Sequence, residues 1–181
     1  NIGQAGISLI KSYEKLRLEA YLPTHDDVPT IGYGSTTGVK MGDVIDEARA
    51  EELLLQDLKH TEDCIEAHVD AELSQGQYDA LCSFIFNEGC HAFKTSTMCN
   101  LLNAGNYAAA QKQFARWNKQ GTTVLAGLTR RRAEEAGLFD FHDVVADITA
   151  KMISRHPHVF GDRNAETPAD VNLLWDAQKD A

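Results

Sequence analysis

Long apolar runs are absent from this sequence. None of its segments approaches the roughly 20 consecutive apolar residues that a membrane-spanning helix requires. We therefore expect no membrane span, and 43% hydrophobic residues in a chain of 181 are enough to form a buried core. The sequence also contains no export signal, so a leader of that kind would have to precede Asn1.

Cysteine is scarce, and its spacing lacks the short pairs that are typical of a zinc site. Four cysteines are also too few to hold 181 residues together as a disulfide scaffold. We expect them to be buried as small apolar side chains, with room for one disulfide whose pairing the sequence leaves open: Cys64, Cys82, Cys90 and Cys99. No metal site and no cofactor are predicted.

Acidic residues are absent from residues 91–132, which contain 7 bases. Residues 41–90 show the opposite balance, with 13 acids and 2 bases, and the whole chain has a net charge of −10. That net charge argues against a nucleic-acid partner. We interpret the acidic segment as solvated helix faces, and the basic segment as either an anion-facing surface or a helix-pairing surface.

Hydrophobic periodicity predicts an α+β fold. A short amphipathic helix ends near Glu14, and prolines and glycines among apolar residues predict short strands and tight turns over 17–36. A long amphipathic helix covers 46–69, and a helix that begins after Ser74 ends near Gly89. Further helices are expected over 95–103, 106–117, 126–138, 141–154 and 168–178. This order predicts a small β-rich N-terminal lobe, a long connecting helix, a helical lobe and a helical tail.

Three carboxyl groups near the N-terminus are candidates for acid–base chemistry. Glu14 is expected at the C-terminal end of an apolar helix, where the helix dipole and partial burial favour the neutral, protonated carboxyl group. Asp26 and Asp27 are the only acids between Tyr21 and Asp43, and they lie in the turn-rich segment. The residues alone leave a structural role open, because glutamates at helix ends and aspartates in turns are common.

A series of ordered motifs resembles a known family. The string SYEKLRLEAY at 12–21, followed by TIGYG at 30–34, resembles the catalytic span of phage-type lysozymes. Further matching blocks follow at 93–97, 101–107, 113–119 and 127–132. The resemblance implies a two-lobed α+β lysozyme domain over residues 1–135, with the substrate cleft between the lobes and the long helix behind it.

The resemblance also implies roles for individual residues. Glu14 takes the family's general-acid position, and Thr30 takes that of a threonine that helps to hold the attacking water. Asp26 is the preferred second carboxylate, and Asp27 is the alternative. The family is described as inverting, which requires the two carboxyl groups to stand about 6.5–9.5 Å apart. Arg131 is the expected partner of Glu14, and a cation there would favour the charged carboxylate.

Two positions depart from the family pattern. The family has an aspartate two residues after the tyrosine of the first motif, whereas this sequence has Pro23, and the segment from Tyr21 to Thr30 is one residue longer than usual. An aspartate on a changed turn must therefore take over, and Asp26 is preferred because it lies nearer to Pro23. Ser35 stands where the family has a histidine, and because serine carries no charge we expect a structural ion pair to be missing, at a cost in stability.

Residues 136–181 have a different character. The segments 133–141, 151–162 and 175–176 resemble the late part of a MazG-type nucleoside triphosphate pyrophosphohydrolase domain. That family binds magnesium through acidic groups on earlier helices, which this sequence lacks, so nucleotide hydrolysis is disfavoured. The apolar side chains of the tail predict burial instead, against the lysozyme domain or against a second copy of the chain in a homo-oligomer.

These features together predict an endolysin, a muramidase of phage-driven host lysis. It would hydrolyse the bond between N-acetylmuramic acid and N-acetylglucosamine in bacterial peptidoglycan. We expect it to act in the periplasm or cell wall of a bacterial host after release from the cytoplasm. The alternative is a catalytically weakened lysozyme scaffold that serves as a binding or oligomerisation module.

Overall fold

The computed structural model describes residues 1–24 and 27–139. Asp26 and the helices expected over 141–154 and 168–178 lie outside the described residues. Within that part, helices predominate and two short antiparallel sheets supply the β structure, which confirms the predicted α+β fold class. No helix among the described residues is long and apolar enough to cross a membrane.

The first helix, α1 (Gln4–Tyr13), ends just before the predicted acid, Glu14. A side chain from another helix caps its N-terminus. The carboxylate of Asp79, on α3 (Gln75–Glu88), accepts hydrogen bonds from the backbone N–H groups of Gly3 at 2.7 Å and Gly6 at 3.0 Å. These bonds satisfy N–H groups that have no partner within α1, at the end where the helix dipole favours a negative charge. A Cβ on Gly6 would come within 2.9 Å of the Asp79 Cβ, so glycine permits this close approach.

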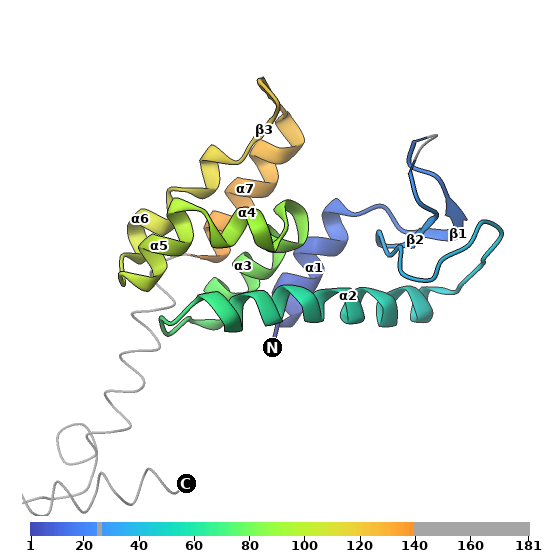
Figure 1. Cartoon of the computed structure of the whole chain (residues 1–181), viewed down its shortest axis with the longest axis horizontal. Coiled ribbons are helices and arrows are strands. Elements are labelled where there is room, and N and C mark those ends of the chain that lie inside the picture. The colour runs from blue at the N-terminus through green and yellow to red at the C-terminus, as the bar shows by residue number, and fades with distance from the viewer. Residues whose placement is uncertain (25–26, 140–181) are drawn as a thin grey trace, which may run out of the picture. The chain divides into compact units, whose positions relative to one another are not determined.

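The small lobe consists of β1, β2 and the loops that lead to α2. β1 (Arg17–Tyr21) and β2 (Thr30–Gly32) pair antiparallel, with Tyr21 opposite Thr30. The segment that carries the turn aspartates therefore connects the ends of two paired strands. In Figure 1 this lobe stands at the far end of the long helix from the other helices.

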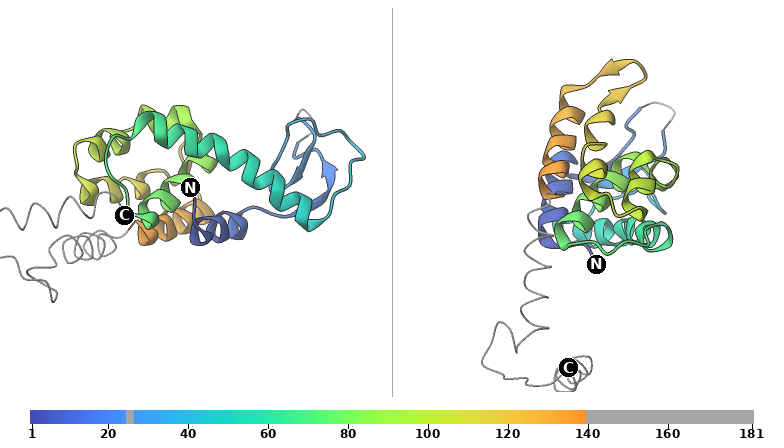
Figure 2. Two further views of the ribbon diagram at one scale, coloured as in Figure 1. Left: turned by 90° about the horizontal axis from the view of Figure 1, so that it is seen from below. Right: turned by 90° about the vertical axis from the view of Figure 1, so that its left-hand side faces the viewer.

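The long helix, α2 (Glu47–His68), connects the two lobes. It begins where the side chain of Asp46 accepts a hydrogen bond from the N–H of Arg49 at 2.8 Å, a standard N-cap. Its first half packs against the small lobe, and its second half runs into the helical lobe, which consists of α1 and α3 to α7 (Figure 2). The predicted helix over 46–69 is confirmed.

The helical lobe begins with α3, whose start and end follow the sequence signals. Ser74 and Gln77 form a capping box at its N-terminus. Gly89 ends it with a φ of 84°, a left-handed conformation that favours glycine. The chain then enters the short helix α4 (Cys90–Lys94), which was not predicted from the sequence.

The remaining elements correct one predicted helix. The expected helix over 106–117 is wrong beyond Gln111, because the chain tightens there into the 3₁₀ turn η1 (Phe114–Arg116). The N–H of Trp117 bonds to the carbonyl of Phe114 at 3.0 Å, and this tighter turn brings both aromatic rings into the core. The elements of this region are α5 (Thr97–Asn103), α6 (Tyr107–Gln111), β3 (Lys119–Gln120), β4 (Thr123–Val124) and α7 (Ala126–Leu138).

Two hydrophobic clusters stabilise the described part of the chain. The larger one fills the helical lobe around Phe84, whose ring meets those of Phe114 at 5.6 Å and Trp117 at 5.3 Å between centroids, edge to face. The smaller one lies along the first half of α2 and joins it to α1 and the small lobe: Ile10, Tyr33, Ala50, Leu54 and Leu58. The smaller cluster holds the small lobe against the first half of α2, and the larger cluster holds the helical lobe against its second half.

Candidate active site

Glu14 lies where α1 ends. Its backbone leaves the helical conformation (φ −92°, ψ 130°), while its N–H still bonds to the carbonyl of Ile10 at 3.0 Å. Its side chain is 27% exposed, so the carboxyl group is partly buried but open to solvent on one side. The helix that positions it is anchored at its other end by Asp79, so the acid sits on a fixed element.

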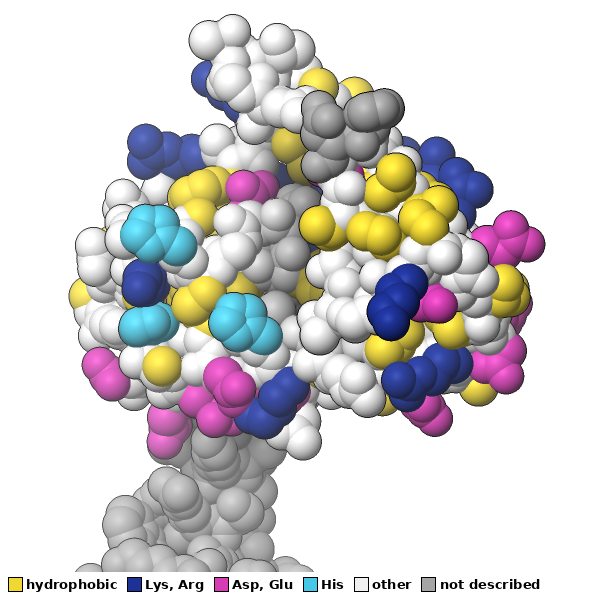
Figure 3. Space-filling model, turned by 45° about the vertical axis from the view of Figure 1, so that its right-hand side comes forward, with side chains coloured by type: hydrophobic (Ala, Val, Ile, Leu, Met, Phe, Trp, Pro, Cys, Tyr) yellow, Lys and Arg dark blue, Asp and Glu magenta, His cyan; other side chains and the backbone are white. Residues whose placement is uncertain are grey.

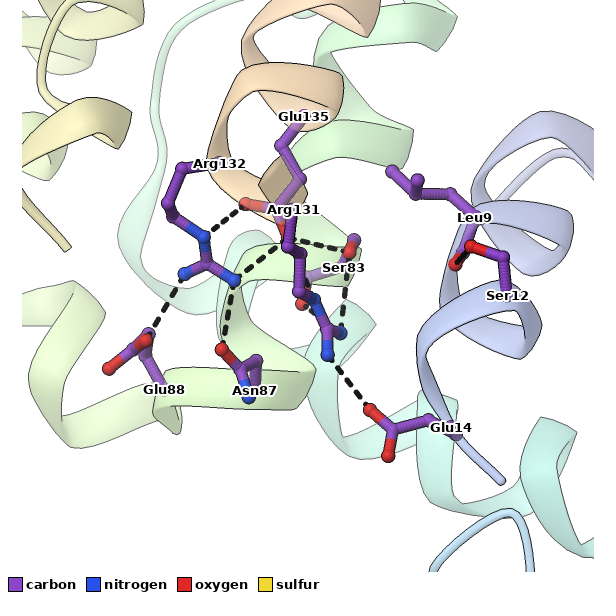
Figure 4. A network of polar contacts seen from close by, with 9 residues as sticks. All are labelled: Leu9, Ser12, Glu14, Ser83, Asn87, Glu88, Arg131, Arg132 and Glu135. Carbon is purple, nitrogen blue, oxygen red and sulfur yellow. Dashed lines mark hydrogen bonds and ion pairs between the residues drawn. The ribbon is translucent and has the colours of Figure 1, made fainter. Parts of the chain in front are cut away.

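Arg131, on α7, holds one oxygen of this acid. Its Nη1 donates to Oε1 of Glu14 at 2.9 Å, across 117 residues of sequence. The guanidinium group is 4% exposed, and its Nη2 donates to the backbone carbonyl of Ser83 at 3.1 Å. In Figure 4 the guanidinium group of Arg131 lies between Ser83 and Glu14, and the second oxygen of Glu14 points away from it. The carboxyl group is therefore oriented by a cation that is itself fixed.

A buried carboxylate, Glu135, in turn fixes Arg131. Its Oε1 accepts hydrogen bonds from Ser83 Oγ at 2.7 Å, Arg132 Nη2 at 3.0 Å and Arg131 Nε at 3.2 Å. The second guanidinium group, that of Arg132, also reaches Asn87. Burial raises the pKa of Glu135 and lowers the pKa of Arg132, and each is opposed by the opposite charge beside it.

This network was not predicted from the sequence. The sequence analysis indicated Arg131 as the partner of Glu14, but it did not indicate Glu135, which is fully buried. The usable signal was the spacing, because Glu135 lies three and four residues after Arg132 and Arg131 and so shares their face of a helix.

A cleft of about 590 Å³ opens beside Glu14. Figure 3 shows a hollow between two bulky parts of the surface, with histidine side chains gathered on one side of it. Its lining comes from both lobes and from α2: Glu14, Tyr33, Gly34, Thr36, Thr37, Gln56, Asp57, His60, Thr61, Ile85, Phe86, Asn87, Gly89 and Cys90. The acid therefore faces a groove large enough for part of a polymeric substrate.

Of the predicted small-lobe residues that the structure describes, neither Asp27 nor Thr30 belongs to this lining. Thr30 is 6% exposed, and its hydroxyl donates to the carbonyl of Val28 at 3.0 Å. Asp27 is exposed, and its carboxylate accepts a hydrogen bond from Thr24 at 2.8 Å, a turn-stabilising contact. The preferred second carboxylate, Asp26, lies outside the described residues. The structure thus brings Glu14 and Arg131 together and leaves the second carboxylate unplaced.

Ser35, which stands where the family has a histidine, makes a hydrogen bond to a carboxylate instead of an ion pair. Its hydroxyl donates to Oδ2 of Asp57, on α2, at 2.5 Å, and the serine is 3% exposed. The connection between the small lobe and α2 at this point therefore exists, but without a second charge.

Three of the four cysteines are buried as predicted, whereas Cys90 is only partly buried. Cys64 and Cys90 form a disulfide that links α2 to α4, and Cys82 and Cys99 are free and buried. Cys90 also lines the cleft, so the bridge supports the cleft wall.

Two lobes joined by a long helix, with a partly buried glutamate at the cleft, define a lysozyme-like glycoside hydrolase. The model of the Phage lysozyme family matches residues 11–135, which is more than half of the chain, and the chain belongs to this family. The match contains the predicted acid, the long helix and the arginine that contacts the acid.

Curated relatives agree with this assignment. The chain is 45% identical over 142 residues to the endolysin of Bacillus phage B103, covering 77% of this chain but 54% of that protein. It is 40% identical over 144 residues to the endolysin of Acyrthosiphon pisum secondary endosymbiont phage 1 and covers 98% of it and 77% of this chain. It is 43% identical over 140 residues to the endolysin of Salmonella phage P22, covering 95% of it and 75% of this chain. The chain thus spans about half of the first relative and nearly all of the other two.

Solved structures share the fold. A point mutant of P22 lysozyme superposes with a TM-score of 0.71 at 41% identity, covering 77% of this chain and 97% of that one. The muramidase domain of SpmX from Asticaccaulis excentricus superposes with a TM-score of 0.72 at 37% identity, with the same coverage of both chains. Sequence identities of 37% and 41% indicate a family relationship in addition to a shared fold.

A second family model, the MazG nucleotide pyrophosphohydrolase domain, matches residues 125–160. Its first part overlaps the lysozyme match and coincides with α7, which packs against α3 and supplies Arg131. Residues 140–160 lie outside the described residues. In the part that is described, α7 thus belongs structurally to the lysozyme body.

Proposed function

We propose that this protein is a muramidase that hydrolyses the bond between N-acetylmuramic acid and N-acetylglucosamine in bacterial peptidoglycan. Its relatives include phage endolysins and a muramidase domain. The observation that carries the proposal is that Glu14 lines the cleft and is held there by Arg131. A glycosidase requires a carboxylic acid fixed beside the scissile bond, and this arrangement provides one.

In this mechanism Glu14 protonates the leaving oxygen. Arg131 holds Oε1, and Oε2 has no hydrogen-bond partner among residues 1–24 and 27–139, so Oε2 is the oxygen that can carry the proton to the substrate. After transfer the carboxylate is negative, and the guanidinium group at 2.9 Å stabilises it. Because Glu135 and Ser83 fix Arg131, the acid returns to the same position after each turnover.

The second half of the reaction is assigned to the turn between β1 and β2. We propose Asp26 as the carboxylate that activates water, with Asp27 as the alternative, and Thr30 as the residue that helps to hold the water. The Thr30 oxygen can accept a hydrogen bond from water while its proton goes to the carbonyl of Val28. Inversion follows if the two carboxyl groups stand about 6.5–9.5 Å apart, which leaves room for that water.

The domain division and site of action complete the proposal. The lysozyme domain is proposed to end near residue 135, although α7 continues to Leu138 and Phe139 is buried in the core of the helical lobe. The segment to residue 181 is proposed to associate with a second copy of the chain rather than to hydrolyse nucleotides. The enzyme is proposed to act on the host cell wall, in the periplasm, after release from the cytoplasm, without a cofactor.

The proposal is tested by substituting the acid and a matched neighbour. Glu14→Gln keeps the shape of the side chain but cannot donate the proton, so lysis should fall at least about hundredfold. Glu19→Gln changes an exposed acid on β1 and should retain lysis. The measurement is the loss of turbidity of chloroform-treated Gram-negative cells, with circular dichroism to verify the fold. Lysis by Glu14→Gln within about tenfold of the unmodified chain would exclude Glu14 as the general acid.

A further inference from the structure

Three potential metal ligands converge beside the cleft. Cys64 and His68 lie one turn apart near the end of α2, and Cys90 begins α4. One ligand atom from each lies within 4.8 Å of the other two. Cys64 is buried, and the other two are partly buried. Two sulfurs and an imidazole nitrogen are the ligands that Zn²⁺ prefers.

The backbone around this cluster is held in place from outside it. The carbonyl of His68, the last residue of α2, accepts a hydrogen bond from Asn103 Nδ2 at 2.9 Å, which ties the end of α2 to α5. The Cα atoms of Cys64 and Cys90 are 5.9 Å apart. The hydrogen bond to α5 does not depend on the bond between the two sulfurs, and the ligand atoms of the three side chains lie near enough to meet at one ion.

The two cysteines have a second chemical state. In a reducing compartment a chain is made with free thiols, and a disulfide forms only where conditions are oxidising. Two thiols and one imidazole can bind Zn²⁺ with the release of two protons, one from each thiol, and without any change of oxidation state. A water molecule completes the tetrahedron that three protein ligands leave open.

We propose that Cys64, His68 and Cys90 bind Zn²⁺ in the thiol form of this protein. The metal connects α2 to α4 in the reduced chain, as the disulfide does in the oxidised chain. Because Cys90 and the preceding Gly89 line the cleft, the cleft wall is then supported in both redox states. Sequence spacing does not reveal the site, because two ligands share a helix turn and the third is on another helix.

The other two cysteines provide internal controls. Burial raises the pKa of Cys82 to about 12, so this thiol resists the deprotonation that metal binding requires. Cys99 is closer, with its Sγ 3.4 Å from the carbonyl oxygen of His68, but it is not one of the three converging ligands. The acids of α2 add a negative field around the site, which favours a cation.

The test uses Co²⁺ as a spectroscopic probe on the full chain. The protein is kept reduced with a phosphine, which breaks the disulfide by transferring oxygen from water to phosphorus and protons to the two thiols. We expect one equivalent of Co²⁺ to give the absorption bands of a tetrahedral thiolate site, and Zn²⁺ to displace it. The oxidised chain, which has the same sequence and fold, should give no such bands. Absence of the bands in the reduced chain, or equal bands in the oxidised chain, overturns the proposal.

A ligand substitution and two matched controls locate the site. His68→Gln should weaken Co²⁺ binding by at least about tenfold, because even the loss of an outer-shell partner costs about 10- to 100-fold in affinity. His60→Gln, on the same helix about two turns earlier, and Cys99→Ala should bind as the unmodified chain does. Equal binding by His68→Gln contradicts the assignment. Metal binding is measured without substrate, so failure here and failure of the proposed muramidase activity are separate results.

Discussion

The two lobes of this molecule are stabilised in different ways. In the described residues, the helical lobe has a core of 14 buried side chains and a buried network in which two arginines surround Glu135. The small lobe shares a cluster of 5 buried side chains with α1 and α2, and the turn that carries the proposed second carboxylate includes the exposed Asp27. The proposed general acid thus belongs to the well-packed lobe, and the proposed second carboxylate belongs to the sparsely packed one.

Because of this difference, the two proposed catalytic carboxyl groups should respond differently to substitution. Changes around Glu14 should first affect the stability of the helical lobe, because its support is buried charge. Changes on the β1–β2 turn should affect activity with little loss of stability, because exposed turn residues contribute few buried contacts.

The largest effect on stability is expected at Glu135. Glu135→Gln removes the fully buried counter-charge that Arg131 and Arg132 share and leaves them only the partly exposed carboxylates of Glu14 and Glu88, which should cost about 3–5 kcal/mol of unfolding free energy. The measurement is urea unfolding monitored by tryptophan fluorescence. The adjacent Glu134→Gln, at an exposed position, should change stability by less than about 0.5 kcal/mol. Equal small losses in both variants would show that the network does not stabilise the helical lobe.

The next effect concerns activity and the small lobe. Asp26→Asn should lower lysis at least about hundredfold, because an amide cannot accept the proton of the attacking water. Asp27→Asn should retain lysis within about threefold, since its carboxylate already accepts the hydrogen bond from Thr24. Both variants should unfold at nearly the same urea concentration as the unmodified chain. The reverse order of activities would transfer the assignment to Asp27, and equal small losses would exclude both.

The smallest effect is expected at Ser35. Ser35→Ala removes the hydrogen bond to Asp57 and should cost about 1–2 kcal/mol in unfolding free energy. Combining it with Asp57→Ala in a double-mutant cycle isolates the coupling between the two side chains. A coupling below about 0.3 kcal/mol would mean that this contact does not join the small lobe to α2.

Much of the fold could be predicted from the sequence, because it depends on local patterns. The amphipathic period of α2 and the capping signals of α3 identified these helices and their ends. The short helix α4 and the β3–β4 pair gave too few residues for a period to be recognised. The predicted helix over 106–117 failed beyond Gln111, because core packing of the aromatic rings overrode helical propensity.

The site could be predicted only in part. The motif around Glu14 indicated the proposed acid, and the matching block at 127–132 indicated Arg131, since both lie in continuous strings of sequence. The role of Glu135 depends on complete burial, and the pairing of Cys64 with Cys90 depends on how α2 meets α4. Neither property is encoded in a local pattern, so neither could be read without the fold.

The proposed muramidase breaks the glycan so that N-acetylmuramic acid becomes the new reducing end. Purified peptidoglycan digested with the full chain, then reduced with borohydride and separated by liquid chromatography and mass spectrometry, reveals which sugar carries each new reducing end. We expect reduced N-acetylmuramic acid in the products of the unmodified chain and of Glu19→Gln, and none above background for Glu14→Gln. New ends on N-acetylglucosamine, or undiminished release by Glu14→Gln, would contradict it.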